Sequence, residues 1–393
     1  MVSMWVFVCL CVSLSWYAAE GFLSRPLLSS LPFSPSGSSP SFEFRKRRSE
    51  TAPSALSAEG GPSLQLKIRP VGIGSCAPPT VITNSDLESI VETDDEWIRT
   101  RTGISRRHVL QEGETLQGLA VEASKKALEN ANFNPENLDL VVLATSSSED
   151  LFGDATGIAA GIGATNAVAF DLTAACSGFV FSMISAGLFL HSGVYKSCLV
   201  IGADALSRWV DWKDRNTCIL FGDAAGAVLF EACGEGEGSV LAYDLHSDGN
   251  RRPQLCLPMQ SKREDLTGGK GHVTKGEFGD ISMNGREVFK FATREVPASI
   301  KLSLEKADLT VDKVDWLLLH QANYRIMEAV ADRLGLPASK ILSNLDEFGN
   351  TSSASIPVAL EQAVREGKVK KGDVIAMAGF GAGLSWGSAV VRW

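Results

Sequence analysis

Continuously apolar runs alternate with amphipathic ones along the chain from Leu64 onward. The runs LDLVVLATS (138–146) and SCLVIGADA (197–205) have continuous apolar centres, which is typical of strands buried on both faces. The segments LQGLAVEASKKALENA (116–131) and YRIMEAVADRLGL (324–336) carry apolar residues at helical spacing. This alternation of buried strands and amphipathic helices predicts an α/β fold.

The order of these runs repeats. ENLDLVVLATS (136–146) matches DKVDWLLLHQA (312–322), and the helix-turn-strand pattern of 178–205 matches that of 355–382. Counting back twenty residues from the turn lysine Lys196 reaches Cys176, and the same count from Lys371 reaches Thr351, next to Asn350. The repeat predicts a duplicated fold with halves at 64–240 and 241–393, in which Cys176 and Asn350 precede equivalent helices. A chance match of apolar runs is the alternative.

Residues 1–63 have a different composition. MVSMWVFVCLCVSLSWYAAEGF (1–22) has the length and apolarity of a signal peptide, although it lacks an early basic charge. The following stretch is rich in Ser and Pro and contains the basic run Arg45–Arg48, as transit peptides do. We expect a signal plus transit segment that leads through the secretory route to the stroma of a complex, apicoplast-like plastid. A membrane anchor and a secreted protein with a pro-segment are the alternatives.

Charge and cysteine spacing narrow the functional class. The net charge of −9 argues against non-specific nucleic-acid binding, and an acidic partner would need a local basic patch. The eight cysteines form no CxxC pair and the five histidines no HExxH motif, so we expect reduced thiols and no metal site. We also expect no membrane segment in the mature form.

Cys176 is the first candidate for chemistry. It lies in DLTAACSGFVF, where a strand-like run meets a long apolar helix between small residues. The partial positive charge of a helix N-terminus would lower the thiol pKa and create a nucleophile, and the Cys176 N–H would be a free donor for an oxyanion. An inert buried thiol is the alternative.

Two further candidates come from the second half. His320 ends the apolar run VDWLLLH, and functional side chains gather at the carboxyl ends of strands in α/β folds. Asn350 lies in EFGNTSSASIP, which holds more capping residues than one helix start requires. The glycine-rich stretch GDVIAMAGFGAGLSWGSAVV (372–391) predicts two strands and a tight turn that supplies backbone N–H groups. The alternatives are a purely structural role for His320, a helix-capping role for Asn350, and a simple hairpin with no role at a site for 372–391.

Together these motifs resemble β-ketoacyl-acyl carrier protein synthase III, an initiating condensing enzyme of the thiolase superfamily. The resemblance runs from Leu64 to Trp393 and rests on ETDDEWIRTRTGISRRH, DLTAACSGF, RNTCILFGDAAGA, HQANYRI, GNTSSASIP and GFGAGLSWGSA. It implies a five-layered αβαβα homodimer with the catalytic triad Cys176, His320 and Asn350. Acetyl-CoA would acylate Cys176, and malonyl-acyl carrier protein would lose CO2 and condense with the acyl group without a further cofactor.

The resemblance also assigns binding residues. The backbone N–H groups of Cys176 and Ala382 would form the oxyanion hole, although Ala382 replaces a glycine common in the family. The residues implied for CoA binding are Thr93, Trp97, Arg101, Arg215, Phe289, Asn323 and Arg325. Those implied for docking the carrier protein are Lys290, Arg325 and Arg333. The sequence departs from the family pattern at 156–166, near the expected acyl pocket, and Leu151 and Phe152 are expected to reach a partner subunit.

Other functions remain open at this stage. A thiolase would carry a second cysteine in the C-terminal glycine-rich turn, and an elongating synthase a histidine at position 350; this chain has neither. Chalcone-type synthases share the triad, but the DEWIRTRTGI match favours the starter enzyme; 3-hydroxy-3-methylglutaryl-CoA synthase is a further alternative. An inactive scaffold or thiol redox sensor is the non-enzymatic alternative.

Overall fold

The computed structural model describes residues 65–266, 268–269 and 271–393. The predicted targeting segment 1–63, with its membrane-anchor alternative, lies outside the described residues.

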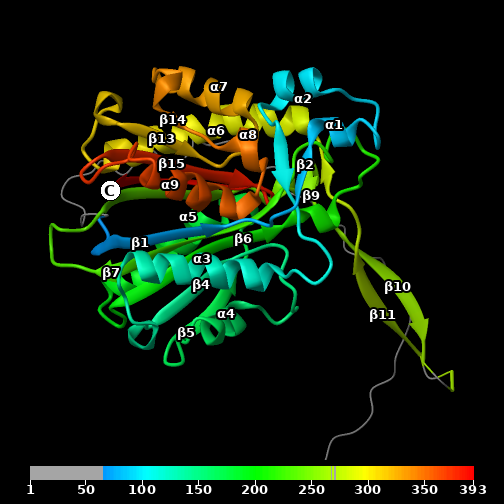
Figure 1. The fold of residues 1–393 in the computed structure, drawn as a ribbon, viewed down its shortest axis with the longest axis horizontal. Coiled ribbons are helices and arrows are strands. Elements are labelled where there is room, and N and C mark those ends of the chain that lie inside the picture. Colours follow the sequence, from blue (N-terminus) through cyan, green and yellow to red (C-terminus); the bar gives the residue numbers. More distant parts are fainter. Residues whose placement is uncertain (1–64, 267, 270) are drawn as a thin grey trace, which may run out of the picture. The chain divides into compact units, whose positions relative to one another are not determined.

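Two five-stranded mixed sheets form the frame of the described chain (Figure 1). The first has the order β1 (Ile68–Cys76), β7 (Asp223–Ala232), β6 (Ser197–Ala205), β4 (Leu140–Ala144), β5 (Val168–Leu172). The second has the order β8 (Val240–Ser247), β16 (Ser385–Arg392), β15 (Val374–Gly381), β13 (Trp316–Leu319), β14 (Ile341–Leu342). In both sheets the first two pairings are antiparallel and the last two are parallel. The duplication is therefore confirmed, while the boundary near residue 240, where β8 begins, stays a prediction.

Helices complete five layers (Figure 1). Helices α3 (Leu116–Asn130) and α4 (Ala155–Gly161) contact the first sheet, and α6 (Gly285–Lys306) with α7 (Tyr324–Leu334) covers the second. Between the sheets, α5 (Gly178–His191) and α9 (Ser355–Arg365) contact strands of both. The α/β prediction and its αβαβα layering are confirmed.

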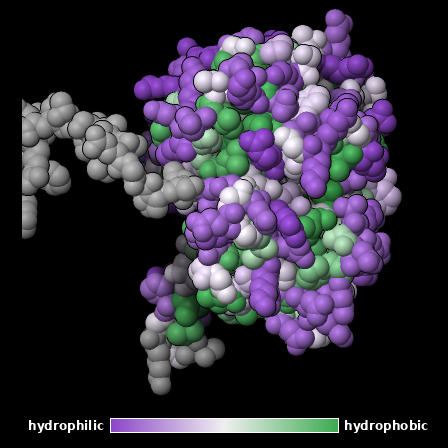
Figure 2. Space-filling view, turned by 90° about the vertical axis from the view of Figure 1, so that its left-hand side faces the viewer, coloured by the Kyte–Doolittle hydropathy of each residue, from purple (hydrophilic) through white to green (hydrophobic). Residues whose placement is uncertain are grey.

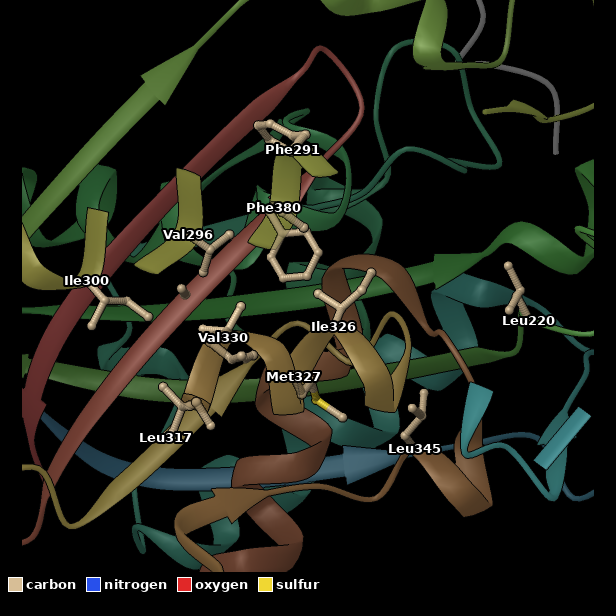
Figure 3. Close-up of a cluster of buried hydrophobic side chains, with 14 of the residues drawn as sticks. Leu220, Phe291, Val296, Ile300, Leu317, Ile326, Met327, Val330, Leu345 and Phe380 are labelled. Atoms are coloured by element: carbon tan, nitrogen blue, oxygen red, sulfur yellow. The ribbon is translucent and has the colours of Figure 1, made fainter. Parts of the chain in front are cut away.

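Each helix layer is held by its own apolar cluster. The middle layer packs Phe179 of α5 and Ile356 of α9 against Val200 of β6 and Leu318 of β13, all nearly inaccessible to solvent. Figure 3 shows the cluster under α6 and α7, to which β15 contributes Phe380. Helix α5 is apolar on all sides because both of its faces are covered, whereas α7 presents a polar face to solvent.

The remaining elements surround the carboxyl ends of the central strands. They are α1 (Asn84–Leu87), α2 (Asp95–Thr102), α8 (Leu345–Phe348), β2 (Val81–Thr83), β3 (Arg106–His108), β9 (Leu255–Cys256), β12 (Ser282–Met283), and the exposed hairpin of β10 (Met259–Asp265) and β11 (His272–Phe278). Helix α2 begins at an Asp94 cap and α7 at an Asn323 cap, and both end at left-handed glycines, Gly103 and Gly335.

One face of the molecule, seen in Figure 2, is hydrophilic over most of its area with scattered hydrophobic patches. Among the described residues, no helix combines the length and apolarity needed to cross a membrane.

The count from the turn lysines placed the counterpart of Cys176 two residues too early, whereas the matched segments 178–205 and 355–382 have the offset seen in the structure. Helices α5 and α9 begin at positions 178 and 355, nineteen residues before β6 and β15 respectively. This offset of 177 makes Ser353, not Thr351, the counterpart of Cys176. Counting from the turn lysines gave the wrong counterpart, because the two lysines are not equivalent: Lys196 directly precedes β6, whereas Lys371 lies three residues before β15.

Candidate active site

A cavity of about 730 Å³ opens at the carboxyl ends of the strands. The three predicted catalytic residues, Cys176, His320 and Asn350, all line it, together with Ala382. Cys176 precedes α5, His320 follows β13, and Asn350 follows α8, so segments far apart in sequence contribute to one wall. The apolar part of the cavity is lined by Leu172, Phe181, Leu206, Leu255, Leu257, Ile281 and Met283.

Cys176 lies in a 3-10 turn (Ala175–Ser177) immediately before α5 and is 7% exposed. Burial raises the pKa of its thiol to about 12; a hydrogen bond from the Ser352 hydroxyl opposes the rise, and the Asp204 carboxylate adds to it. The predicted lowering of the pKa is therefore wrong. Desolvation of the sulfur outweighs the stabilisation of a thiolate by the helix N-terminus, which is roughly 2 kcal/mol at best.

Two glycines of β15 allow the backbone of Cys176 to lie against that strand. A Cβ atom on Gly381 would lie 2.9 Å from the backbone nitrogen of Cys176, and one on Gly379 would lie 2.8 Å from the Cα of Ser177. Ala382 follows directly in the turn between β15 and β16. The two predicted strands and the turn between them are confirmed. That the turn supplies N–H groups to the site stays a prediction, while the close approach explains why glycines are needed at 379 and 381.

Left-handed backbone marks both turns that carry the site. Ala175 (φ 47°) precedes Cys176, and its counterpart Ser352 (φ 51°) lies in the 3-10 turn Ser352–Ala354 before α9. Such conformations cost of order 1 kcal/mol or more for residues with a side chain. The Ser352 hydroxyl lies 3.4 Å from the Cys176 sulfur and donates to it.

The amide of Asn350 has a defined orientation. Its Oδ1 accepts a hydrogen bond of 2.9 Å from the Ser352 backbone N–H. The backbone of Asn350 pairs with the segment at Leu220 and Gly222, at 2.8 and 3.1 Å. This contact fixes the orientation of the amide, and the amide nitrogen is the side-chain donor of Asn350 at the cavity.

His320 is buried and neutral. Its Nδ1 lies 2.7 Å from the Ser355 hydroxyl, and its ring meets that of Phe380 edge to face at 5.2 Å. Burial lowers the imidazole pKa to about 3, against an opposing hydrogen bond to the Ser352 backbone. The residue therefore offers a neutral imidazole at neutral pH.

A buried carboxylate that the sequence analysis missed supports the turn before α9. Asp204 at the end of β6 accepts hydrogen bonds from the backbone N–H and hydroxyl of Ser353, at 3.0 and 2.7 Å, and from Ser147 at 2.8 Å. It thereby ties the second half to the first behind Cys176. The surplus of serines in GNTSSAS was the available signal, since Ser352, Ser353 and Ser355 all serve this site.

The predicted CoA residues form a rim beside the cavity. Trp97 of α2 is flanked by the guanidinium groups of Arg101 at 5.2 Å and Arg215 at 4.6 Å. Asn323 donates to the Arg101 carbonyl at 3.1 Å, and Arg325 Nε donates to the Thr100 carbonyl at 3.0 Å, which joins α2 to α7.

The predicted CoA positions differ in whether they reach the main cavity. Phe289 and Asn323 line the cavity itself. The Thr93 hydroxyl oxygen is buried, has no hydrogen-bond partner within the described part of the chain, and does not line the main cavity.

The three predicted docking residues are spread over two helices. Lys290 of α6 pairs with Glu287 at 2.6 Å and borders a smaller cavity with Arg251 and Arg294. Arg325 and Arg333 stand at opposite ends of α7, about 12 Å apart along the helix axis. The sequence analysis missed Arg251, Arg294 and also Arg252, which lines the main cavity.

The segment that departs from the family pattern borders a second cavity of about 620 Å³. Thr156 lines this second cavity rather than the main one, while Ser146, Thr173 and Leu257 line both. Leu151 and Phe152 also border it and are 87% and 97% exposed. In the parts of the chain that are described, no group of three or more His, Cys, Asp or Glu residues is placed to hold a metal ion.

Family models and curated relatives identify the family to which this chain belongs. The family models for the 3-oxoacyl-[acyl-carrier-protein] synthase III domain and its C-terminal domain match residues 170–249 and 304–393. A β-ketoacyl-[acyl-carrier-protein] synthase III of Synechocystis sp. is 53% identical over 328 residues, covering 84% of this chain and 98% of the relative. The chain belongs to the 3-oxoacyl-[acyl-carrier-protein] synthase III family. The family predicted from the motifs is confirmed, as is an acyl-transferring condensing enzyme.

Other members of the family extend this likeness. The synthase of Synechococcus sp. is 54% identical over 323 residues, covering 82% of this chain and 95% of the relative. The crystal structure of the Aquifex aeolicus synthase superposes with a TM-score of 0.76 at 42% identity, covering 83% of this chain and all of the other. The thiolase-like fold is therefore confirmed at the level of solved family structures.

Proposed function

We propose that this protein starts type II fatty acid synthesis by condensing acetyl-CoA with malonyl-acyl carrier protein. The products are acetoacetyl-acyl carrier protein, CoA and CO2. The observation that carries the proposal is the meeting of Cys176, His320 and Asn350 in one cavity of a chain that belongs to this family.

In the first half-reaction the sulfur of Cys176 attacks the thioester carbonyl of acetyl-CoA. The new S–C bond forms, the C–S bond to CoA breaks, and the thiol proton ends on the CoA sulfur. The Ser352 hydroxyl stabilises the developing thiolate through its hydrogen bond. The backbone N–H groups of Cys176 and Ala382 receive the oxyanion, a role supported by the packing of Gly381 on Cys176.

In the second half-reaction malonyl-acyl carrier protein loses CO2 and leaves an enolate. The Asn350 amide nitrogen and a ring N–H of His320 donate hydrogen bonds to the thioester oxygen, on which the negative charge develops. The enolate carbon attacks the acyl group on Cys176, a C–C bond forms, and the released thiolate takes up a proton from solvent. Neutral donors suit this buried site, because an unpaired charge would cost several kcal/mol there.

CoA would enter across the rim of α2 and α7. The adenine stacks on Trp97 between the two arginines, Arg101 and Arg215, whose charges also serve the phosphates. Thr93, Phe289, Asn323 and Arg325 line the path of the pantetheine arm. Lys290, Arg325 and Arg333 supply the basic patch for the acidic carrier protein.

We also propose a homodimer. Strand β5 lies at the edge of the first sheet, and the nearby side chains of Leu151 and Phe152 are almost fully exposed. A second copy that pairs at this edge would cover the side chains of Leu151 and Phe152. These two side chains would then reach the active site of that second copy. Sedimentation of a single species with the monomer mass would contradict this assembly.

We place the mature enzyme in the stroma of a complex plastid. The support is the two-part composition of residues 1–63 and the similarity to cyanobacterial enzymes, since plastids descend from cyanobacteria. Residues 1–63 fused to a fluorescent protein should reach the plastid, and retention elsewhere would refute the location.

The function is tested by incubating purified enzyme with acetyl-CoA and either malonyl-acyl carrier protein or malonyl-CoA. We expect acetoacetyl-acyl carrier protein from the carrier-bound substrate and much less product from the CoA-bound one. A preference for malonyl-CoA would point to a chalcone-type enzyme, and condensation without decarboxylation to a thiolase. Product formation by the Cys176→Ser variant at the wild-type rate would refute the proposal.

A further inference from the structure

The hydroxyl of Ser355 has one proton and two acceptors within reach. It lies 2.8 Å from the Ser352 carbonyl oxygen and 2.7 Å from Nδ1 of His320. The Gln321 backbone N–H, 3.3 Å away, can only donate to the hydroxyl oxygen. Where the single proton points therefore decides whether Nδ1 must donate or accept.

Two neutral tautomers of His320 follow from this choice. If the hydroxyl donates to the Ser352 carbonyl, Nδ1 carries the ring proton and Nε2 is bare. If the hydroxyl donates to Nδ1, the ring proton sits on Nε2. Burial holds the imidazole pKa near 3, so the doubly protonated ring does not compete at neutral pH.

The Ser352 carbonyl oxygen has another hydrogen-bond donor besides the Ser355 hydroxyl. It already accepts the backbone N–H of Ser355 at the end of the 3-10 turn. The hydroxyl proton is therefore free to be given to His320 without leaving a buried carbonyl unpaired.

We propose that Ser355 is a positioning residue that fixes His320 as the Nε2–H tautomer by donating its hydroxyl proton to Nδ1. This rests on the proposed function, in which His320 must donate a hydrogen bond to the malonyl thioester oxygen. Nδ1 is occupied by Ser355, so Nε2 is the nitrogen left for the substrate, and only the protonated form can donate. Acyl transfer to Cys176 does not use this donor.

The variant Ser355→Ala removes the only side-chain donor that the described contacts give Nδ1. The imidazole then keeps its hydrogen bond to the Ser352 backbone, whose carbonyl can only accept. The ring proton moves to Nδ1 and Nε2 loses its donor role. We expect condensation to slow by about 100-fold or more, as for loss of one transition-state donor, while acetylation of Cys176 changes less than about 3-fold.

The direct readout is the pair of ring ¹⁵N chemical shifts of His320, assigned with His320→Gln. Wild-type protein should show a protonated Nε2, and Ser355→Ala a protonated Nδ1. Ser355→Thr, which keeps the hydroxyl, should retain the wild-type tautomer and most of the condensation rate. Ser182→Ala is the matched control, because it removes a buried hydroxyl that has no hydrogen-bond partner among the described residues.

The outcomes separate this inference from the proposed function. A protonated Nδ1 in wild type, or an unchanged tautomer in Ser355→Ala, overturns the inference whatever the enzyme's activity. Equal loss of acetylation and condensation would show a merely structural role and also overturn it. If Ser355→Ala does not fold, Ser355→Cys, with its weaker donor, is measured in the same way. Failure of wild-type protein to condense would refute the proposed function, while the ring shifts would still decide the tautomer.

Discussion

The Ser352 hydroxyl donates a hydrogen bond to the Cys176 sulfur across 3.4 Å, and this contact joins the two halves of the fold at the reacting atom. Ser352 lies in the left-handed turn that also directs its own N–H to Asn350. Its backbone also forms a hydrogen bond with His320, so this one residue in a left-handed conformation contacts all three predicted catalytic groups.

Replacing Ser352 by Ala should slow acylation of Cys176. The hydrogen bond opposes the burial that raises the thiol pKa, so its loss raises the pKa further and lowers the thiolate fraction. A bond of about 1 kcal/mol predicts a loss of about 5-fold. Iodoacetamide alkylation of Cys176, followed by peptide mass analysis, measures the thiolate fraction. Equal alkylation rates in Ser352→Ala and wild type would show that the contact has no such effect.

The reactivity of Cys176 should increase throughout the alkaline range. With a thiol pKa of about 12, the thiol form dominates below that pH and the thiolate fraction grows about tenfold per pH unit. We expect the alkylation rate to rise without a plateau from pH 7 to pH 10. A plateau near neutral pH would mean that the thiolate is already formed, as the helix-dipole argument from the sequence predicted.

Replacing Trp97 by Ala should weaken CoA binding with little change in kcat. Loss of a stacking surface worth about 1–3 kcal/mol predicts a rise in KM for acetyl-CoA of about 5- to 100-fold. The matched substrate is acetyl-pantetheine, which lacks the adenine and should be used equally well by both proteins. A similar loss with both substrates would place the adenine elsewhere.

Charge reversal at Lys290 or Arg325 should raise the KM for malonyl-acyl carrier protein. Of the two variants, Lys290→Glu should leave the rate of Cys176 acetylation by acetyl-CoA nearly unchanged. We expect about a 10-fold effect at low salt that shrinks as ionic strength rises, because exposed charges are screened. Lys301→Glu, on the same helix α6 eleven residues further on, is the control. An equal effect at Lys301 would indicate net charge rather than a docking patch.

Much of this fold could be predicted because its signals are local. The alternation of apolar runs gave the strands and helices, and the motifs around Cys176, His320 and Asn350 indicated that they share a site. The counterpart of Cys176 was misplaced by two residues because it was counted from the turn lysines. Helix α5 is fourteen residues long and α9 eleven, and the turns that follow them place the lysines differently.

The electrostatics of the site could not be predicted from sequence. The sign of the Cys176 pKa shift depends on how completely the sulfur is desolvated, which is set by β15 and by the turn at Ser352, both distant in sequence. For the same reason Asp204 was missed, since its hydrogen bonds to Ser147 and Ser353 exist only after the two halves pack together.

The central claim is that the buried sulfur of Cys176 is the acyl acceptor of this cavity, and intact-mass analysis after incubation with acyl-CoA tests it most directly. We predict one acetyl group per chain, located on the peptide containing Cys176 and absent from Cys176→Ala. Panels of longer acyl-CoAs in the same experiment report the starter preference. Acetylation that persists in Cys176→Ala, or no mass increase in the wild-type enzyme, would contradict the account.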